Sequence, residues 1–99
     1  MINGKSNMDK MTWDEFQSWQ RWDEFPEREE NPPMTVDVMF VYEGNEYFIA
    51  FDYGQFHIYT KDWNEIYSHE NFLKLLTTPI ELFHGKSFSG NINSLRFYT

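Results

Sequence analysis

The segment 34–61 constrains the fold more than any other part of the chain. It contains three runs rich in Val, Ile, Phe and Tyr, and only two residues separate neighbouring runs, Gly44-Asn45 and Gly54-Gln55. The runs are 35–43, 46–53 and 56–61. Apolar runs joined by two residues that include glycine are typical of β-hairpins. The segment therefore predicts a three-stranded antiparallel meander.

These turn positions also predict which residues face each other across the sheet. The expected pairs are Tyr42 with Tyr47, Phe40 with Ile49, Val38 with Phe51, Val36 with Tyr53, Tyr53 with Phe56, and Phe51 with Ile58. In this register the large apolar side chains of all three strands lie on one face, and a slip of one residue would destroy that agreement. We interpret this face as the core face of the sheet.

The opposite face of the predicted sheet is mixed in character. Its apolar end contains Met39, Phe48 and Tyr59. Its polar end is a cross-strand row of Asp37, Asp52 and His57. Two carboxylates beside an imidazole could form an acid/base pair, whereas opposite charges across strands are also ordinary stabilisers of sheets. We expect a surface ion pair here, with no catalytic residue, and no metal ion because a fourth ligand is missing.

The sequence before the meander predicts a helix. Thr12 and Glu15 form a capping box, which marks a helix start. Pro26 disfavours helical geometry in the residue before it, so the helix is expected over 12–25. A charged linker bounded by prolines follows at 26–33.

The sequence after the meander predicts one or two further helices. Ser68 is a good N-cap, and the Leu-rich run behind it predicts a helix over 68–77. The last segment is ambiguous between a short helix over 87–95 and an edge strand over 95–98.

The length of 99 residues allows one domain. Residues 1–11 are polar and lack periodicity, so we expect a flexible tail there and a single domain over 12–99. The fold class is then α+β: a three-stranded antiparallel meander with an N-terminal helix and one or two C-terminal helices.

The composition excludes several classes of function. The chain has no cysteine, which removes disulfides, thiolate zinc sites and cysteine nucleophiles. Its net charge of −8 disfavours direct binding to nucleic acid. Gly85-Lys86-Ser87 lacks the earlier glycine of a phosphate-binding loop, because position 80 is Ile. No apolar stretch is typical of a secretory signal or a membrane span, so we expect a cytoplasmic protein without a cofactor.

Residues 42–88 combine a tight meander, an aromatic residue in an acidic turn, the start of a Leu-rich helix and a Gly-Lys-Ser turn. The residues that carry this pattern are Trp63, Ser68, Glu70, 72–76 and Gly85-Lys86-Ser87. In these features the chain resembles small uncharacterised proteins of low-GC Gram-positive bacteria and of their phages and plasmids. The resemblance covers about half of the chain and implies a phage-accessory role without catalytic residues. The sequence departs from it at 88–91, where those proteins have an acidic, Leu-rich helix.

The first predicted helix is the strongest candidate for a binding element. Its aromatic residues recur every third position, so the rings wind around the helix and do not form one stripe. Trp and Tyr dominate binding hot spots, and interleaved acids suit a groove with a basic rim. The alternative is that the rings fill a small core. The predicted partner-binding residues are Trp19, Trp22, Asp23, Glu24, Phe25, Met39, Phe48 and Tyr59.

These patterns favour a non-enzymatic protein-interaction module of phage or mobile-element origin, with a protein partner that is basic. One alternative is a nucleic-acid mimic that inhibits a DNA- or RNA-binding protein, because an acidic surface fits a basic groove. Another is a small enzyme that uses Asp52 and His57. We expect a monomer or a weak homodimer.

Overall fold

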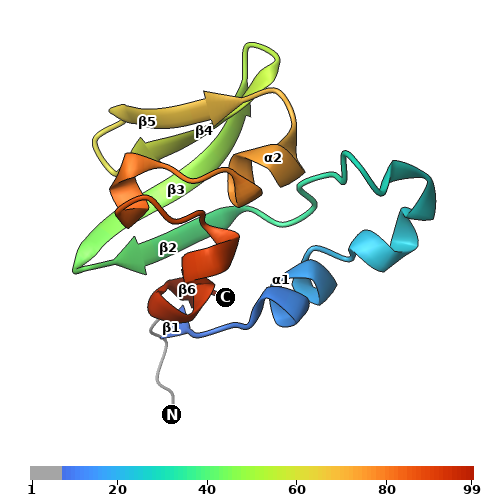
Figure 1. Cartoon of the computed structure of the whole chain (residues 1–99), viewed down its shortest axis with the longest axis horizontal. Coiled ribbons are helices and arrows are strands. Elements are labelled where there is room, and N and C mark those ends of the chain that lie inside the picture. Colours follow the sequence, from blue (N-terminus) through green and yellow to red (C-terminus); the bar gives the residue numbers. More distant parts are fainter. Residues whose placement is uncertain (1–7) are drawn as a thin grey trace.

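An antiparallel sheet of six strands, ordered β1-β6-β2-β3-β4-β5, organises the part of the chain that this computed structural model describes, residues 8–99 (Figure 1). The strands are β1 (Met8–Asp9), β2 (Val38–Tyr42), β3 (Asn45–Asp52), β4 (Gln55–Thr60), β5 (Glu65–His69) and β6 (Arg96–Tyr98). The α+β class and the meander β2-β3-β4 are therefore confirmed, but β1 and β5 were not predicted, and β6 was predicted only as one of two alternatives for the C-terminal segment.

The register of the meander differs from the predicted one by two residues. The turns are Glu43-Gly44 and Tyr53-Gly54, and all four of these residues have positive φ, as type I′ turns require. Glycine occupies the second turn position, with φ of 82° at Gly44 and 77° at Gly54. The predicted turns at Gly44-Asn45 and Gly54-Gln55 were wrong, because they put Asn45 and Gln55 at the second turn position, which glycine occupies.

A shift of two residues changes the partners of each residue but keeps its face. Val38 lies opposite Ile49, Phe40 opposite Tyr47, and Ile49 opposite Ile58. All of these side chains are buried, so the predicted core face is confirmed for this part of the meander. The prediction was wrong for Phe51 and Tyr53, which are 57% and 93% exposed because they lie at the far end of β3 and in the turn beyond it.

The first helix is shorter than predicted. α1 (Trp13–Trp19) begins with the predicted capping box of Thr12 and Glu15, and it ends six residues before Phe25. It ends early because Arg21 adopts the left-handed conformation, with φ of 59°. Two 3₁₀ turns follow at Trp22–Glu24 and Pro26–Arg28.

Gln20 holds the chain after α1 in place. Its side chain is completely buried, its Oε1 accepts hydrogen bonds from the backbone N–H groups of Thr35 and Val36, and its Nε2 donates to the carbonyl of Val36. The Thr35 hydroxyl in turn donates to the carbonyl of Gln20. The end of α1 is thereby tied to the segment that leads into β2.

The second helix also begins later than predicted. α2 (Phe72–Thr77) is capped by Asn71, whose side chain accepts a hydrogen bond from the N–H of Lys74. Ser68, the predicted cap, belongs instead to β5, because the chain turns at 61–64 and pairs with β4 before the helix starts.

Both predictions for the C-terminal segment describe part of it. A 3₁₀ helix covers Ser89–Ser94, and β6 follows at Arg96–Tyr98. β6 is not an edge strand, because it lies between β2 and β1. A flexible tail was predicted over residues 1–11. This is wrong for the end of that segment, because β1 pairs with β6 and Met11 is buried. Residues 1–7 lie outside the described residues.

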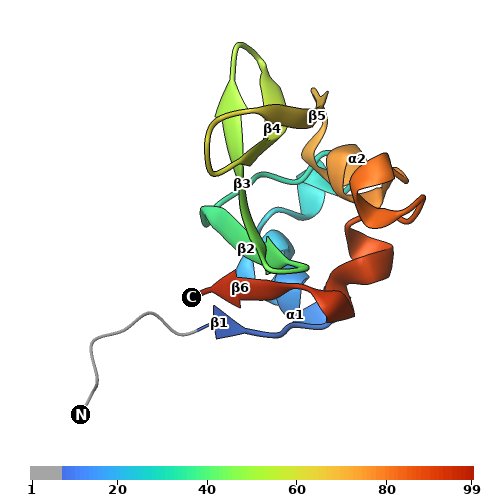
Figure 2. The same cartoon turned by 90° about the vertical axis from the view of Figure 1, so that its left-hand side faces the viewer.

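The core lies between the sheet and the helices. α2 and the C-terminal 3₁₀ helix lie on one side of the sheet, as Figure 2 shows, and α1 packs on the same face through Phe16. The fully buried rings are Phe16, Phe40, Phe72, Phe83, Phe88 and Phe97. Phe88 contacts both Phe16 and Phe40, with ring centroids 5.4 Å apart in each pair. Helices cover this face, whereas the side chains of the opposite face remain accessible.

Candidate functional site

Three of the predicted partner-binding residues form a direct cross-strand row on the uncovered face of the sheet. Met39 of β2 lies opposite Phe48 of β3, which lies opposite Tyr59 of β4. The rings of Phe48 and Tyr59 are 5.4 Å apart, and Met39 is 45% exposed. The structure therefore brings together the residues that the sequence placed at the apolar end of this face.

Trp63 completes this cluster. It lies in the loop between β4 and β5, and its ring is 4.6 Å from that of Phe48 and 5.3 Å from that of Tyr59. The side chain is nevertheless 66% exposed. We call Met39, Phe48, Tyr59 and Trp63 the outer-face patch. Met39 and Trp63 are exposed, and Phe48 and Tyr59 are half-buried between them. Contiguous apolar surface marks interaction sites more often than scattered apolar residues do.

The backbone at Trp63 is unusual for a bulky residue. Its φ is 67°, in the left-handed region that costs an L-residue roughly 1–2 kcal/mol. The loop is closed by bonds from the N–H of Trp63 to the carbonyl of Thr60 and from the N–H of Thr60 to the carbonyl of Asn64. Glycine is the usual residue at such a position of a hairpin loop. The sequence predicted only that Trp63 lies in a turn. Its place on the sheet face depends on the strand at 65–69, which was not predicted.

A pocket of about 590 Å³ adjoins the patch. It opens where the chain entering β2 diverges from β3: β2 begins opposite Ile49, but β3 continues to Asp52. The lining residues are Met34, Asp37, Val38, Met39, Phe48, Ile49, Ala50, Phe51 and Trp63. Methionines in such a lining adapt to different contacting shapes, because the side chain is flexible and polarizable.

The predicted polar row does not form. Asp52 lies opposite Gln55, and His57 lies opposite Ala50, because of the two-residue difference in register. The carboxylate partner of His57 is Glu65 of β5, which the sequence did not predict, since the strand that carries it was not recognised. Asp37 lines the pocket beside the patch, whereas His57 lies outside that pocket.

His57 is held between two acceptors. Its Nδ1 lies 2.5 Å from Oε1 of Glu65, and its Nε2 lies 2.9 Å from the backbone carbonyl of Asp52. Both contacts are hydrogen bonds only when the imidazole is doubly protonated. Burial by itself would lower the pKa of His57, but the bond to Asp52 and the bond and charge of Glu65 together raise it above its usual value. When it is doubly protonated, the imidazole thus ties β5 to the end of β3.

The acids around the patch also act on Tyr59. Burial raises the pKa of its phenol, and the negative charges of Asp52 and Glu65 raise it further. The ring of Tyr59 is stacked on the imidazole of His57, with centroids 5.3 Å apart. The apolar centre of the patch is therefore bordered on the β4 side by two carboxylates, of which Glu65 is paired with His57.

The five predicted residues at the end of α1 and after it lie elsewhere. Trp19 packs against Phe97 in the core, and Trp22 donates from Nε1 to the carbonyl of Pro33 at 2.8 Å. Phe25 is half-buried, whereas Asp23 and Glu24 are exposed. The structure does not bring these residues to the outer-face patch, because the helices lie on the other side of the sheet.

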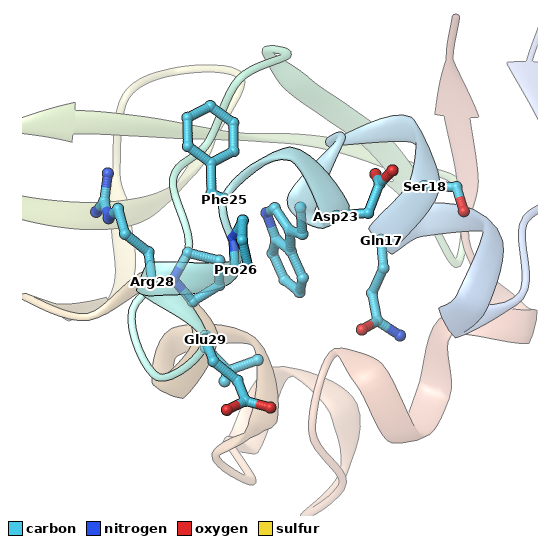
Figure 3. Close-up of a pocket in the computed structure, with 10 residues that line it drawn as sticks. Gln17, Ser18, Asp23, Phe25, Pro26, Arg28 and Glu29 are labelled. Carbon is cyan, nitrogen blue, oxygen red and sulfur yellow. The ribbon is translucent and has the colours of Figure 1, made fainter.

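A second pocket, of about 430 Å³, lies beside these residues. Figure 3 shows Arg28, Pro26 and Glu29 on one side of it and Gln17 and Asp23 on the other. Trp22, Phe25 and Leu73 add apolar surface. Its charges are of both signs, so it has no single electrostatic preference.

Within residues 8–99, no group of three His, Asp or Glu side chains could hold a metal ion. No helix in the same range is long and apolar enough to cross a bilayer. The chain matches no protein-family model, no curated protein and no solved structure.

Proposed function

We propose that this chain is a non-enzymatic protein-binding module that contacts a basic protein partner through the outer-face patch. The observation that carries the proposal is the grouping of Met39, Phe48, Tyr59 and Trp63 on the one face of the sheet that the helices leave uncovered. Trp and Tyr are the residues that most often dominate binding energy at protein interfaces.

The conformation of Trp63 supports a role beyond folding. A glycine at this position would remove the backbone cost of a positive φ, and the ring is mostly exposed to solvent. Ring contacts with Phe48 and Tyr59 return about 0.5–1.5 kcal/mol each, which roughly offsets that cost. Stability alone therefore gives little reason for a tryptophan here.

The charge around the patch specifies the partner. Asp37 lines the adjoining pocket, and Asp52 and Glu65 lie close enough to Tyr59 to raise its pKa. An apolar centre with an acidic border fits a partner that presents an apolar anchor surrounded by lysine or arginine.

The test separates binding from folding. The wild-type chain is used to capture and identify a partner, and the dissociation constant of the purified pair is then measured by calorimetry. Trp63→Gly should weaken binding at least tenfold, while its free energy of unfolding stays within about 1 kcal/mol of wild type. Tyr53→Asn, which changes a 93% exposed aromatic residue outside the patch, should leave the affinity unchanged.

A charge-reversal pair tests the acidic border. Asp37→Lys at the pocket should weaken the complex, whereas Asp23→Lys, on the other side of the molecule, should not. A partner that binds Trp63→Gly and Asp37→Lys as tightly as wild type would show that the patch is not the contact surface.

Salt dependence distinguishes this proposal from nucleic-acid mimicry. A mimic would have a DNA- or RNA-binding partner, and its affinity would fall steeply with salt because charge supplies most of the attraction. The apolar centre of the patch favours an interface whose affinity falls only modestly.

A further inference from the structure

β5 forms a free edge of the sheet. It pairs with β4 on one side, and no strand of the described chain follows it in the sheet order (Figure 1). The backbone N–H and C=O groups that point outward from Glu65–His69 therefore have no strand partner. The opposite edge is different, because β1 covers only two of the described residues.

This edge carries only some of the features that usually keep exposed strands from pairing. Natural edge strands are often interrupted by proline or carry lysine. β5 has neither, and Ile66 on it is 38% exposed. A register shift opposite Ile58 and Tyr59 distorts the start of the strand, but the pairs from Tyr67 to His69 are regular.

A groove of about 530 Å³ runs beside the same edge. One wall comes from β5, with Ile66 and Tyr67, and the other from the segment 79–82, with Ile80 and Leu82. In strand addition, backbone hydrogen bonds supply affinity and adjoining pockets accept alternate side chains. The edge and the groove provide both parts.

Charge decides what kind of strand fits. Glu65 and Glu81 line the groove, and none of its lining residues, all within the described range, is basic. A second copy of this chain would bring its own acids and a net charge of −8 to the same place, which opposes pairing of two β5 edges. A segment that alternates apolar and basic residues has the complementary charge.

We propose that the edge of β5 and the groove beside it bind an extended peptide segment of alternating apolar and basic residues by adding it as a seventh strand. This surface shares only Glu65 with the acidic border of the outer-face patch, and the inference does not depend on the function proposed for that patch.

The probe is an acetylated, amidated heptapeptide of alternating lysine and valine, titrated into the ¹⁵N-labelled chain. Amide hydrogen exchange should slow at alternate residues of Glu65–His69 and stay unchanged in β1. A peptide with the same side chains, N-methylated along one edge, cannot form the backbone bonds and should bind at least tenfold more weakly. A glutamate-valine peptide should also bind at least tenfold more weakly.

Two variants test whether the peptide binds at β5. Ile66→Lys puts a charge on the edge and should weaken binding of the lysine-valine peptide at least tenfold, whereas Phe48→Thr on the outer-face patch should leave it unchanged. The proposal is wrong if the N-methylated peptide binds as well as the parent, or if β5 gains no protection at saturation. It is also wrong if the chain alone forms dimers in which the β5 amides are protected.

Discussion

At the scale of single residues, Gln20 shows how one polar side chain can decide the course of the backbone. It is the only fully buried polar side chain among residues 8–99, and three backbone groups of Thr35 and Val36 depend on it. Buried amides are tolerated only when their hydrogen bonds are made. Gln20 therefore links the end of α1 to the entry of β2, although the two are far apart in the sequence.

Replacing this residue should be costly. Gln20→Leu keeps a similar volume but leaves the N–H groups of Thr35 and Val36 and one carbonyl without partners, so we expect the free energy of unfolding to fall by about 2–4 kcal/mol. Urea denaturation followed by tryptophan fluorescence measures it. Gln17→Leu serves as the control, because Gln17 is only half-buried and should change stability by less than about 1 kcal/mol. Equal stabilities of the two variants would contradict the role of Gln20.

At the scale of elements, the two tight turns set the register of the meander. Each type I′ turn combines a residue with a side chain, Glu43 or Tyr53, with a glycine, and each holds both residues at positive φ. Asparagine is preferred over other residues at the first of these positions because it tolerates the left-handed conformation. The turns thus carry a backbone cost that a single substitution could remove.

Substitutions at the second turn should move stability in opposite directions. Tyr53→Asn should raise the free energy of unfolding by about 0.5–1 kcal/mol, because the tyrosine is 93% exposed and contributes little packing. Gly54→Ala should lower it by about 1–2 kcal/mol through the positive φ alone, since no atom lies within 4 Å of the added Cβ. Thermal denaturation of both variants tests the turn assignment. The assignment is wrong if Gly54→Ala is as stable as wild type.

At the scale of the whole molecule, most acids in the described part of the chain form no ion pair with a basic residue of that part. The ion pairs found among residues 8–99 are His57 with Glu65 and His84 with Glu43, and neither involves lysine or arginine. With a net charge of −8, repulsion between the acids opposes the compact state. Interactions between exposed charges are screened by salt, so this opposition depends on ionic strength.

Added salt should therefore stabilise the chain. Raising NaCl from about 10 mM to about 150 mM shortens the Debye length from roughly 30 Å to roughly 8 Å, and the melting temperature should rise by a few degrees. A double variant, Glu24→Lys with Glu30→Lys, is less negative and should respond less. A melting temperature that falls with salt would show that attractive ion pairs outweigh the repulsion.

Local signals in the sequence were sufficient for the elements whose structure is determined locally. The capping box of Thr12 and Glu15 and the alternating pattern of β2, β3 and β4 predicted a helix start, a meander and its core face. The same alternation placed Met39, Phe48 and Tyr59 on one face of the sheet. A period of two survives a register error of two residues, which is why these predictions remained correct when the individual pairs did not.

Pairing between distant segments required the tertiary structure. β1 and β6 are short and lie at opposite ends of the described chain. No sequence signal indicated β1, and the sequence left β6 open between a strand and a helix. β5 is polar at both ends, so its pairing with β4 could not be read from its composition. Because β5 was not predicted, the position of Trp63 on the sheet face and the pairing of His57 with Glu65 were not predicted either. The sequence by itself determined which side chains can be buried and where the chain can turn, because these depend on neighbouring residues. The tertiary structure decided which strands meet and which face stays uncovered, because those depend on contacts between residues far apart in the chain.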